Sequence, residues 1–123
     1  MARKKKDEQE ELNVSSKLKN VKLLYNTGRL KEAIAYMYTI YTDLALQKYG
    51  VRKTFSQTVR DFAIIMVKQH GQDPANIYPF IQQIEKAIYG GYPSTPEFFM
   101  QIVESFGNIY REMSGHRLPS LNL

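Results

Sequence analysis

The basic residues in the first quarter of the chain are the clearest candidates for a chemical role. Four of them form the run Arg3 to Lys6, and others recur in the segment 17–31, which holds no acid. Lysine and arginine can neutralise nucleic-acid phosphates without recognising a base sequence. The same pattern is typical of the solvated face of an amphipathic helix, so both interpretations stay open. The residues predicted to contact DNA or RNA nonspecifically are Arg3, Lys4, Lys5, Lys6, Lys19, Lys22 and Arg29.

Acidic residues directly after the basic run weaken this hypothesis. Four acids fall between Asp7 and Glu11, and they can neutralise the run within the tail itself. Almost nothing apolar lies among residues 1–14, so we expect a disordered charged tail there. The net charge of +5 over 123 residues still favours acidic partners for the chain as a whole.

Tyrosine is the second unusual residue type, since the chain has nine tyrosines and no tryptophan. Four of them lie on or near one predicted helix, at positions 36, 38, 41 and 49, and the first three cannot all face a single core. An exposed tyrosine is often an interface residue, because the side chain is large, stiff and amphipathic. A partly buried ring with a hydrated hydroxyl is the alternative. Leucines near the C-terminus are spaced as in a docking peptide. The residues predicted at a protein interface are Tyr36, Tyr38, Tyr41, Leu118 and Leu121.

Residues suited to catalysis or metal binding are scarce. The chain has two histidines and no cysteine. Disulfides and zinc–thiolate sites are therefore excluded, and a transition metal would need carboxylates to converge from separate helices. No motif positions a serine nucleophile. We therefore predict no catalytic residue, no metal, no cofactor and no small-molecule substrate.

The segment IYGGYPSTPEFF, residues 88–99, looks most like a ligand-binding loop. A phosphate-binding loop needs Gly-x-x-x-x-Gly-Lys-Ser/Thr after a strand, or three spaced glycines between a strand and a helix. The segment has neither pattern. Instead, Gly90 or Gly91 can end one helix with a positive φ. Ser94 can cap the next helix and Pro96 can begin it. We interpret the segment as a joint between two helices.

Apolar residues recur at helical spacings along most of the chain. Between Leu30 and Leu44 the intervals are 4, 3, 4 and 3, which is the period of an α-helix. The expected helices run from Ser15 or Ser16 to Asn26, from Leu30 to Tyr49, from near Thr58 to Gly71, from Asn76 to the Gly90–Gly91 pair, and from Ser94 to Gly115. No strand is predicted. The expected fold is all-α: a compact bundle of four main helices plus a short N-terminal helix, in residues 15–115, followed by a flexible tail at 116–123.

Length and hydropathy bound the class of protein. A chain of 123 residues corresponds to one domain. No apolar run approaches about 18 residues, so no membrane insertion is expected. The lack of cysteine makes the cytoplasm the default compartment.

Arg111 and His116 are separated by four residues. This Arg-x4-His spacing resembles the catalytic signature of HEPN ribonucleases. In those enzymes the arginine and histidine side chains activate and protonate groups at an RNA phosphodiester. The resemblance implies a ribonuclease that uses this pair. Gly115, directly before the histidine, predicts instead that the helix has ended. Arg111 is then a solvated cation near a helix C-terminus, where the helix dipole favours it.

Three short motifs carry a resemblance that spans about residues 18–114. They are Gly28, Glu32, Ala33 and Ile34; then Thr58, Arg60, Asp61 and Phe62; then Ala87, Tyr89, Gly90 and Gly91. In this order they resemble the small helical domain of unknown function found at the cytoplasmic C-terminus of transglutaminase-like membrane proteins. The chain departs from that pattern in having no membrane segment and no protease-like partner domain. The resemblance implies a fold and no activity.

These observations favour a non-catalytic adaptor or accessory subunit of a larger protein complex. Another protein subunit is the expected partner. The basic residues extend this hypothesis to a complex associated with nucleic acid, in replication, repair or the ribosome. The alternative is the HEPN-like ribonuclease.

Overall fold

The computed structural model describes the backbone of residues 2–123 and the side chains of residues 14–123. This part of the chain is helical and contains no strand. Its helices are α1 (Ala2–Asn26), α2 (Leu30–Tyr49), α3 (Val59–His70), α4 (Pro74–Ile88) and α5 (Pro96–Ser114). The predicted all-α bundle is confirmed.

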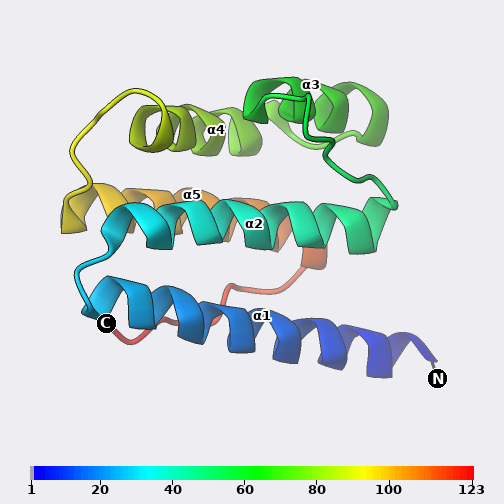
Figure 1. Cartoon of the computed structure of the whole chain (residues 1–123). Coiled ribbons are helices and arrows are strands. Elements are labelled where there is room, and N and C mark those ends of the chain that lie inside the picture. The colour runs from blue at the N-terminus through cyan, green and yellow to red at the C-terminus, as the bar shows by residue number, and fades with distance from the viewer. Residues whose placement is uncertain (1) are drawn as a thin grey trace.

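The helices form three tiers, with α2 and α5 in the middle (Figure 1). The central helix α2 packs against α1, α4 and α5, and α3 packs against α4. The C-terminal segment, residues 116–123, returns from the end of α5 along the tier that contains α1 (Figure 1). Helix α3 and the two loops beside it therefore lie on the opposite side of the molecule from α1.

The core lies between the tiers, and α2 contributes to both of its halves. The buried residues Ile34, Met37, Tyr41 and Ala45 recur every three or four positions along α2, which is the spacing of one helical face. Aromatic rings from three other helices complete the upper half. The largest fully buried side chains are Tyr41, Tyr110, Phe62, Phe80, Phe99, Phe106, Ile34, Met37, Ile40, Met66, Ile77 and Ile81.

The bounds of α2 and α3 agree with those predicted from the sequence. Helix α2 runs from Leu30 to Tyr49, and α3 is capped by Thr58 and ends before Gly71. A capping box is present at the start of α3, because Thr58 Oγ1 accepts a hydrogen bond from Asp61 N and the Asp61 carboxylate accepts one from Thr58 N. A reciprocal cap fixes the helix start because it satisfies two backbone donors at once.

The start of α4 differs from the prediction. Asp73, and not Asn76, caps the helix, since Asp73 Oδ1 accepts a hydrogen bond from Ala75 N at 2.9 Å. Pro74 follows at the first helical position, where its fixed φ suits the helix and its missing N–H costs nothing. Asn76 instead donates from Nδ2 to Glu112 Oε1 at 2.8 Å. Pro79 consequently lies inside the helix and not in its first turn.

The start of α5 shifts by one residue. Thr95, and not Ser94, caps this helix, because Thr95 Oγ1 accepts a hydrogen bond from Phe98 N at 3.1 Å. Pro96 then occupies the first helical position. An adjacent serine and threonine are both competent caps, and the position of the proline selects between them.

The N-terminal helix is longer than expected. Its start was predicted at Ser15 or Ser16, and that is wrong, because α1 begins at Ala2. Residues 2–14, assigned from sequence to a disordered tail, therefore have helical backbone. Apart from Asp7, Asn13 and Val14, these residues are alanine, arginine, lysine, glutamate, glutamine and leucine, which are the strongest helix formers.

Candidate protein-interaction surface

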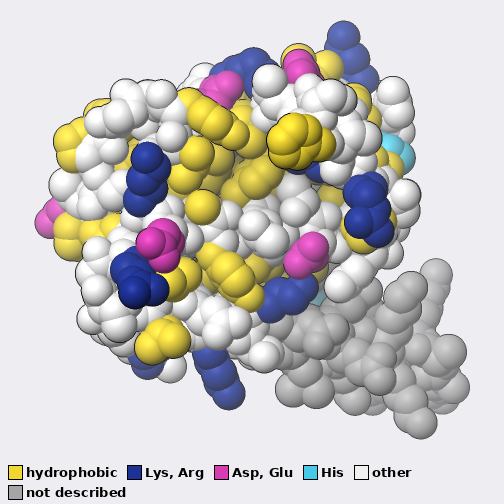
Figure 2. Space-filling model, viewed as in Figure 1, with side chains coloured by type: hydrophobic (Ala, Val, Ile, Leu, Met, Phe, Trp, Pro, Cys, Tyr) yellow, Lys and Arg dark blue, Asp and Glu magenta, His cyan; other side chains and the backbone are white. Residues whose placement is uncertain are grey.

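A groove of about 580 Å³ opens where α3 begins and α4 ends. It is lined by residues 55–61 together with Ile64, Glu85 and Tyr89, and we call it the Phe55 groove. Figure 2 shows hydrophobic side chains gathered on this face of the molecule, between the α3 and α4 helices. The groove brings together the loop before α3, one face of α3 and the last turns of α4.

The loop between α2 and α3 turns Phe55 outward. Thr54 N donates to Gln57 Oε1 at 2.9 Å, and Gln57 N donates to Thr54 O at 3.2 Å, so the two residues close a tight turn. Phe55 lies within this turn, and its relative exposure is 105%. The side chain therefore projects into solvent at the rim of the groove.

A charged pair joins the two helices that form the groove. Arg60 Nη2 and Nε donate to the two carboxylate oxygens of Glu85 at 2.6 and 3.1 Å. The hydrogen bond with Glu85, and then its negative charge, raise the pKa of Arg60 above its ordinary value. A bidentate arginine–carboxylate pair fixes the relative orientation of its partners. The pair thus holds α3 and α4 in register where the groove opens, although both side chains remain partly exposed.

The joint after α4 supplies a second group of exposed aromatic residues. Tyr89 is 73% exposed and Tyr92 is 50% exposed. The Tyr92 ring packs 4.7 Å from the Phe98 ring, and Lys86 Nζ lies 5.9 Å from its centroid. Tyr89 forms part of the groove wall. Tyr89 thus borders the groove from this side, and Tyr92 packs on Phe98 within the joint.

Both positions of the joint favour glycine, for different reasons. Gly91 has φ +66°, which glycine adopts without strain. Gly90 has no such angle, but a Cβ there would lie 3.1 Å from Lys86 Cα and 3.1 Å from Lys86 O. The sequence left open which glycine supplies the positive φ, and it is Gly91. The interpretation of residues 88–99 as a joint agrees with this geometry.

The structure corrects the interface prediction for Tyr41. Its side chain is fully buried, and Tyr41 Oη donates to Gln72 Oε1 at 2.5 Å. Phe62 and Phe80 pack edge-on against its ring, at centroid distances of 6.2 and 5.8 Å. Burial raises the pKa of Tyr41 well above its ordinary value. Tyr41 therefore belongs to the core and cannot contact a partner.

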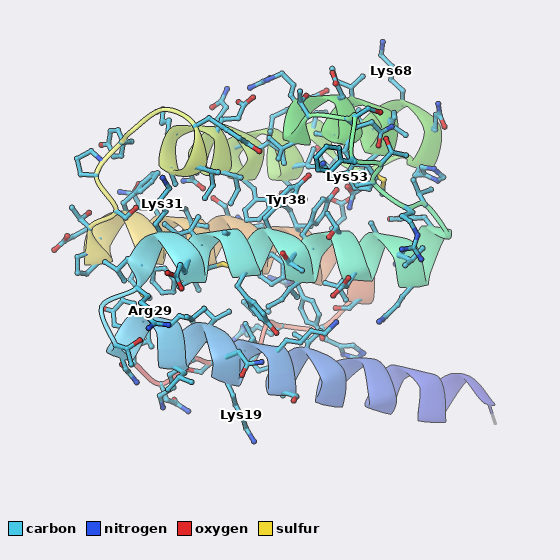
Figure 3. The ribbon with its side chains drawn as sticks, in the orientation of Figure 1. Lys19, Arg29, Lys31, Tyr38, Lys53 and Lys68 are labelled. Atoms are coloured by element: carbon cyan, nitrogen blue, oxygen red, sulfur yellow. The ribbon has the colours of Figure 1, made fainter. Side chains whose placement is uncertain are left out.

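Tyr36 and Tyr38 are half-buried on α2. Tyr36 Oη accepts a hydrogen bond from Asn20 Nδ2 at 3.1 Å, which ties α1 to α2. The Tyr38 ring stacks on Phe80 with centroids 6.4 Å apart, and in Figure 3 it points from α2 toward the upper tier. Burial raises the pKa of Tyr38 well above its usual range. Both residues mainly connect helices of the bundle.

Leu118 and Leu121 contact the chain's own bundle. Leu121 is only 9% exposed and belongs to the core, against which Leu118 also packs. Pro119 to Asn122 line a hollow with Leu18, Lys19 and Lys22 of α1. The structure corrects the prediction of a free docking peptide, because residues of α1 and α5 already cover these leucines.

The predicted phosphate-contacting residues are spread along α1 and its turn into α2. Lys19 and Lys22 line one hollow beside the C-terminal segment, and Lys19 points away from the bundle in Figure 3. Arg29 lies at the turn, with Nη1 3.9 Å from a Glu32 carboxylate oxygen. The side chains of Arg3, Lys4, Lys5 and Lys6 lie outside the described ones. The structure therefore brings together Lys19 and Lys22.

Arg111 and His116 do not share a helical face. Helix α5 ends at Ser114, and Gly115 follows in the left-handed conformation with φ +76°. His116 N then donates to Ser114 Oγ at 3.0 Å, so the chain has already turned away from the helix axis. The predicted end of the helix before His116 is confirmed.

Sequence reasoning missed the aromatic residues of the groove. Phe55 is a lone aromatic residue in the polar segment KTFSQT, between two predicted helices. A large apolar residue outside any helical period is a usable signal, since no core face accounts for it. Tyr89 stands directly before the glycine pair, and it was treated there as part of the joint alone.

No protein-family model matches the chain, and neither the curated proteins nor the solved structures contain a significant match to it. The resemblance to the transglutaminase-associated helical domain therefore stays a prediction. In the part of the chain that the structure describes, no helix is long and apolar enough to cross a membrane. Within that same part, no three histidine or acidic side chains group so that they could hold a metal ion.

Proposed function

We propose that the protein is a non-catalytic interaction module, a small helical subunit that joins a protein assembly through the Phe55 groove. The observation that carries this proposal is a fully exposed phenylalanine in the lining of a groove whose other apolar surface comes from Ile64 and the Tyr89 ring. Contiguous exposed apolar surface on a soluble domain marks a site of interaction. Scattered single apolar residues would need no such explanation.

The shape of the groove fits protein recognition. Ile64 is half-buried and Tyr89 is mostly exposed, so an entering side chain would meet apolar surface on two sides. The Arg60–Glu85 pair gives the same groove a polar edge. An apolar centre with a polar, partly solvated rim is the usual anatomy of a protein–protein interface.

Site-specific crosslinking tests this proposal. A photo-crosslinking phenylalanine analogue at position 55, in the protein expressed in its own cells, should form an adduct with a protein. Leu23 is the matched control position, because it is an exposed apolar residue, 62% accessible, on α1. A crosslinked species seen at position 55 and not at 23 supports the proposal. No adduct at position 55, or the same adducts at both positions, would contradict it.

Association with nucleic acid is a second, separate proposal, and it rests on Lys19 and Lys22. Both line the same hollow on α1, and phosphate contacts by such lysines would be independent of sequence. The double variant Lys19→Glu, Lys22→Glu should weaken binding to every DNA or RNA sequence alike. It should also reduce the slope of log affinity against log salt by about two. An unchanged slope would reject this role.

A further inference from the structure

We propose that the Phe55 groove holds a second copy of this chain, in a two-fold symmetric dimer in which each Phe55 enters the partner's groove. The inference rests on the interaction module proposed above and identifies its partner at this surface. A two-fold contact uses the same patch on both chains, so the patch must be complementary to itself. The groove and the side chain that would fill it lie next to each other here.

The protruding side chain and the cavity match in chemistry. Phe55 is the most exposed large apolar side chain among residues 14–123, with a relative exposure of 105%. The groove offers Ile64 and the Tyr89 ring as apolar surface within about 580 Å³. An aromatic anchor in a partner's pocket is the usual centre of binding energy in a protein interface. A two-fold dimer would contain two such anchors.

The charges of the groove also suit a second copy better than an acidic partner. The groove contains one cation, Arg60, and two carboxylates, Asp61 and Glu85. A nucleic acid or an acidic peptide would meet both carboxylates at close range, which costs free energy. Arg60 and Glu85 neutralise each other within one copy, so two copies would meet at this surface with little local repulsion.

The expected contact area corresponds to a weak dimer. Covering two aromatic side chains, Phe55 and Tyr89, removes about 300–500 Å² from solvent on each copy. A specific interface at the small end buries roughly 600 Å² per partner, so the remaining area would have to come from the groove rim. Interfaces at this small end belong to weak, transient complexes, and we expect association in the micromolar range. Because each copy carries a net charge of +5, general repulsion opposes dimerisation, and added salt should strengthen the dimer slightly.

Sedimentation equilibrium between about 1 and 500 µM tests this inference. The wild-type chain should pass from monomer to dimer with a dissociation constant on the order of micromolar. Phe55→Ser should raise that constant about a hundredfold, about tenfold for each of the two anchors. Leu23→Ser, an equally conservative loss of an exposed side chain on α1, should leave it unchanged. The variant chains should fold normally, because both side chains are mostly or fully exposed.

A mixing experiment distinguishes the two-fold arrangement from general stickiness. Tyr89→Ala removes one wall of the groove but keeps Phe55, whereas Phe55→Ser removes Phe55 but keeps the Tyr89 wall. Each variant alone should dimerise weakly. An equimolar mixture should recover association, because the heterodimer retains one complete contact: Phe55 of one chain in the intact groove of the other.

The outcomes separate this inference from the function on which it rests. A monomer at all concentrations, or a dimer unaffected by Phe55→Ser, would overturn the second copy as occupant. If the crosslink at position 55 then joins a different protein, the interaction module stands with another partner. If position 55 crosslinks to the chain itself and the mixture recovers association, both hold.

Discussion

Two aromatic clusters of this protein, the core around Tyr41 and the rim of the Phe55 groove, use the same residue types in opposite ways. Around Tyr41, the rings of Phe62 and Phe80 lie within 6.2 Å, and the side chains are fully buried. Around the groove, Phe55 and Tyr89 face solvent. The first cluster stabilises the fold of the chain, and the second displays apolar surface to solvent.

The largest contrast between the clusters should be in stability. Phe80→Ala should lower the free energy of unfolding by about 3–5 kcal/mol, because it removes a buried ring and leaves a cavity. Tyr89→Ala should change it by less than about 0.5 kcal/mol for the monomer, since this side chain is mostly exposed. Urea denaturation at low protein concentration measures both. Losses of stability of similar size in the two variants would contradict the distinction between the two clusters.

Alkaline pH should act on the core cluster. Burial raises the pKa of Tyr38 and Tyr41 in the folded state, whereas the unfolded chain has ordinary tyrosines with a pKa of about 10. Below that pH, both tyrosines are protonated in the folded and in the unfolded state, and their contribution to the free energy of unfolding is complete. Above it, only the unfolded chain releases the proton, so stability falls as pH rises toward the folded-state pKa, by about 1.4 kcal/mol per pH unit for each tyrosine.

The control for this titration is the double variant Tyr38→Phe, Tyr41→Phe. Lysines also titrate near pH 10, but they are the same in both proteins. The difference between the two stability curves therefore isolates the tyrosines. Equal slopes for wild type and variant above pH 10 would show that these hydroxyls are not held protonated by burial.

The two core hydroxyls should respond differently to removal at neutral pH. Tyr41→Phe should cost about 1–3 kcal/mol, because it leaves the buried Gln72 Oε1 without its donor. Tyr38→Phe should be neutral or slightly stabilising, since Tyr38 Oη is buried and has no hydrogen-bond partner among the described residues. Thermal and urea unfolding of the two single variants gives the comparison directly. The reverse order of stability would contradict the assigned hydrogen bond.

The smallest expected effect concerns the frame of the groove. Thr58→Ala should cost about 1 kcal/mol, because it removes one half of the α3 capping box. Ser56→Ala, in the same loop and exposed, is the matched control and should change stability by less than about 0.5 kcal/mol. The Thr58 variant should also weaken self-association, since the loop that carries Phe55 leads directly into this cap.

Much of the fold was predictable because its boundaries are local. Gly50 and Gly71 end helices as expected, and the Thr58–Asp61 cap is visible in the sequence. The starts of α4 and α5 were displaced, since each region holds two residues able to cap. Competition between caps is decided by the neighbouring proline, which is a weaker signal.

The candidate site was less predictable because burial depends on packing between distant segments. Tyr36, Tyr38 and Tyr41 have similar local sequence, yet only the packing of α3, α4 and α5 buries Tyr41 completely. Likewise, Leu118 and Leu121 have the spacing of a docking peptide, and the bundle itself is what they contact. Phe55 carried a local signal, but the groove beside it exists only once α3 meets α4.

The central claim, that the Phe55 groove is where this chain meets a second copy, is tested most directly by amide chemical shifts on dilution. Backbone resonances of the wild-type protein should be recorded from about 500 to 10 µM. We expect concentration-dependent shifts confined to residues 55–64 and 85–92, and their loss in Phe55→Ser. Shifts confined to α1 and the C-terminal segment, or no shifts at all over this range, would contradict it.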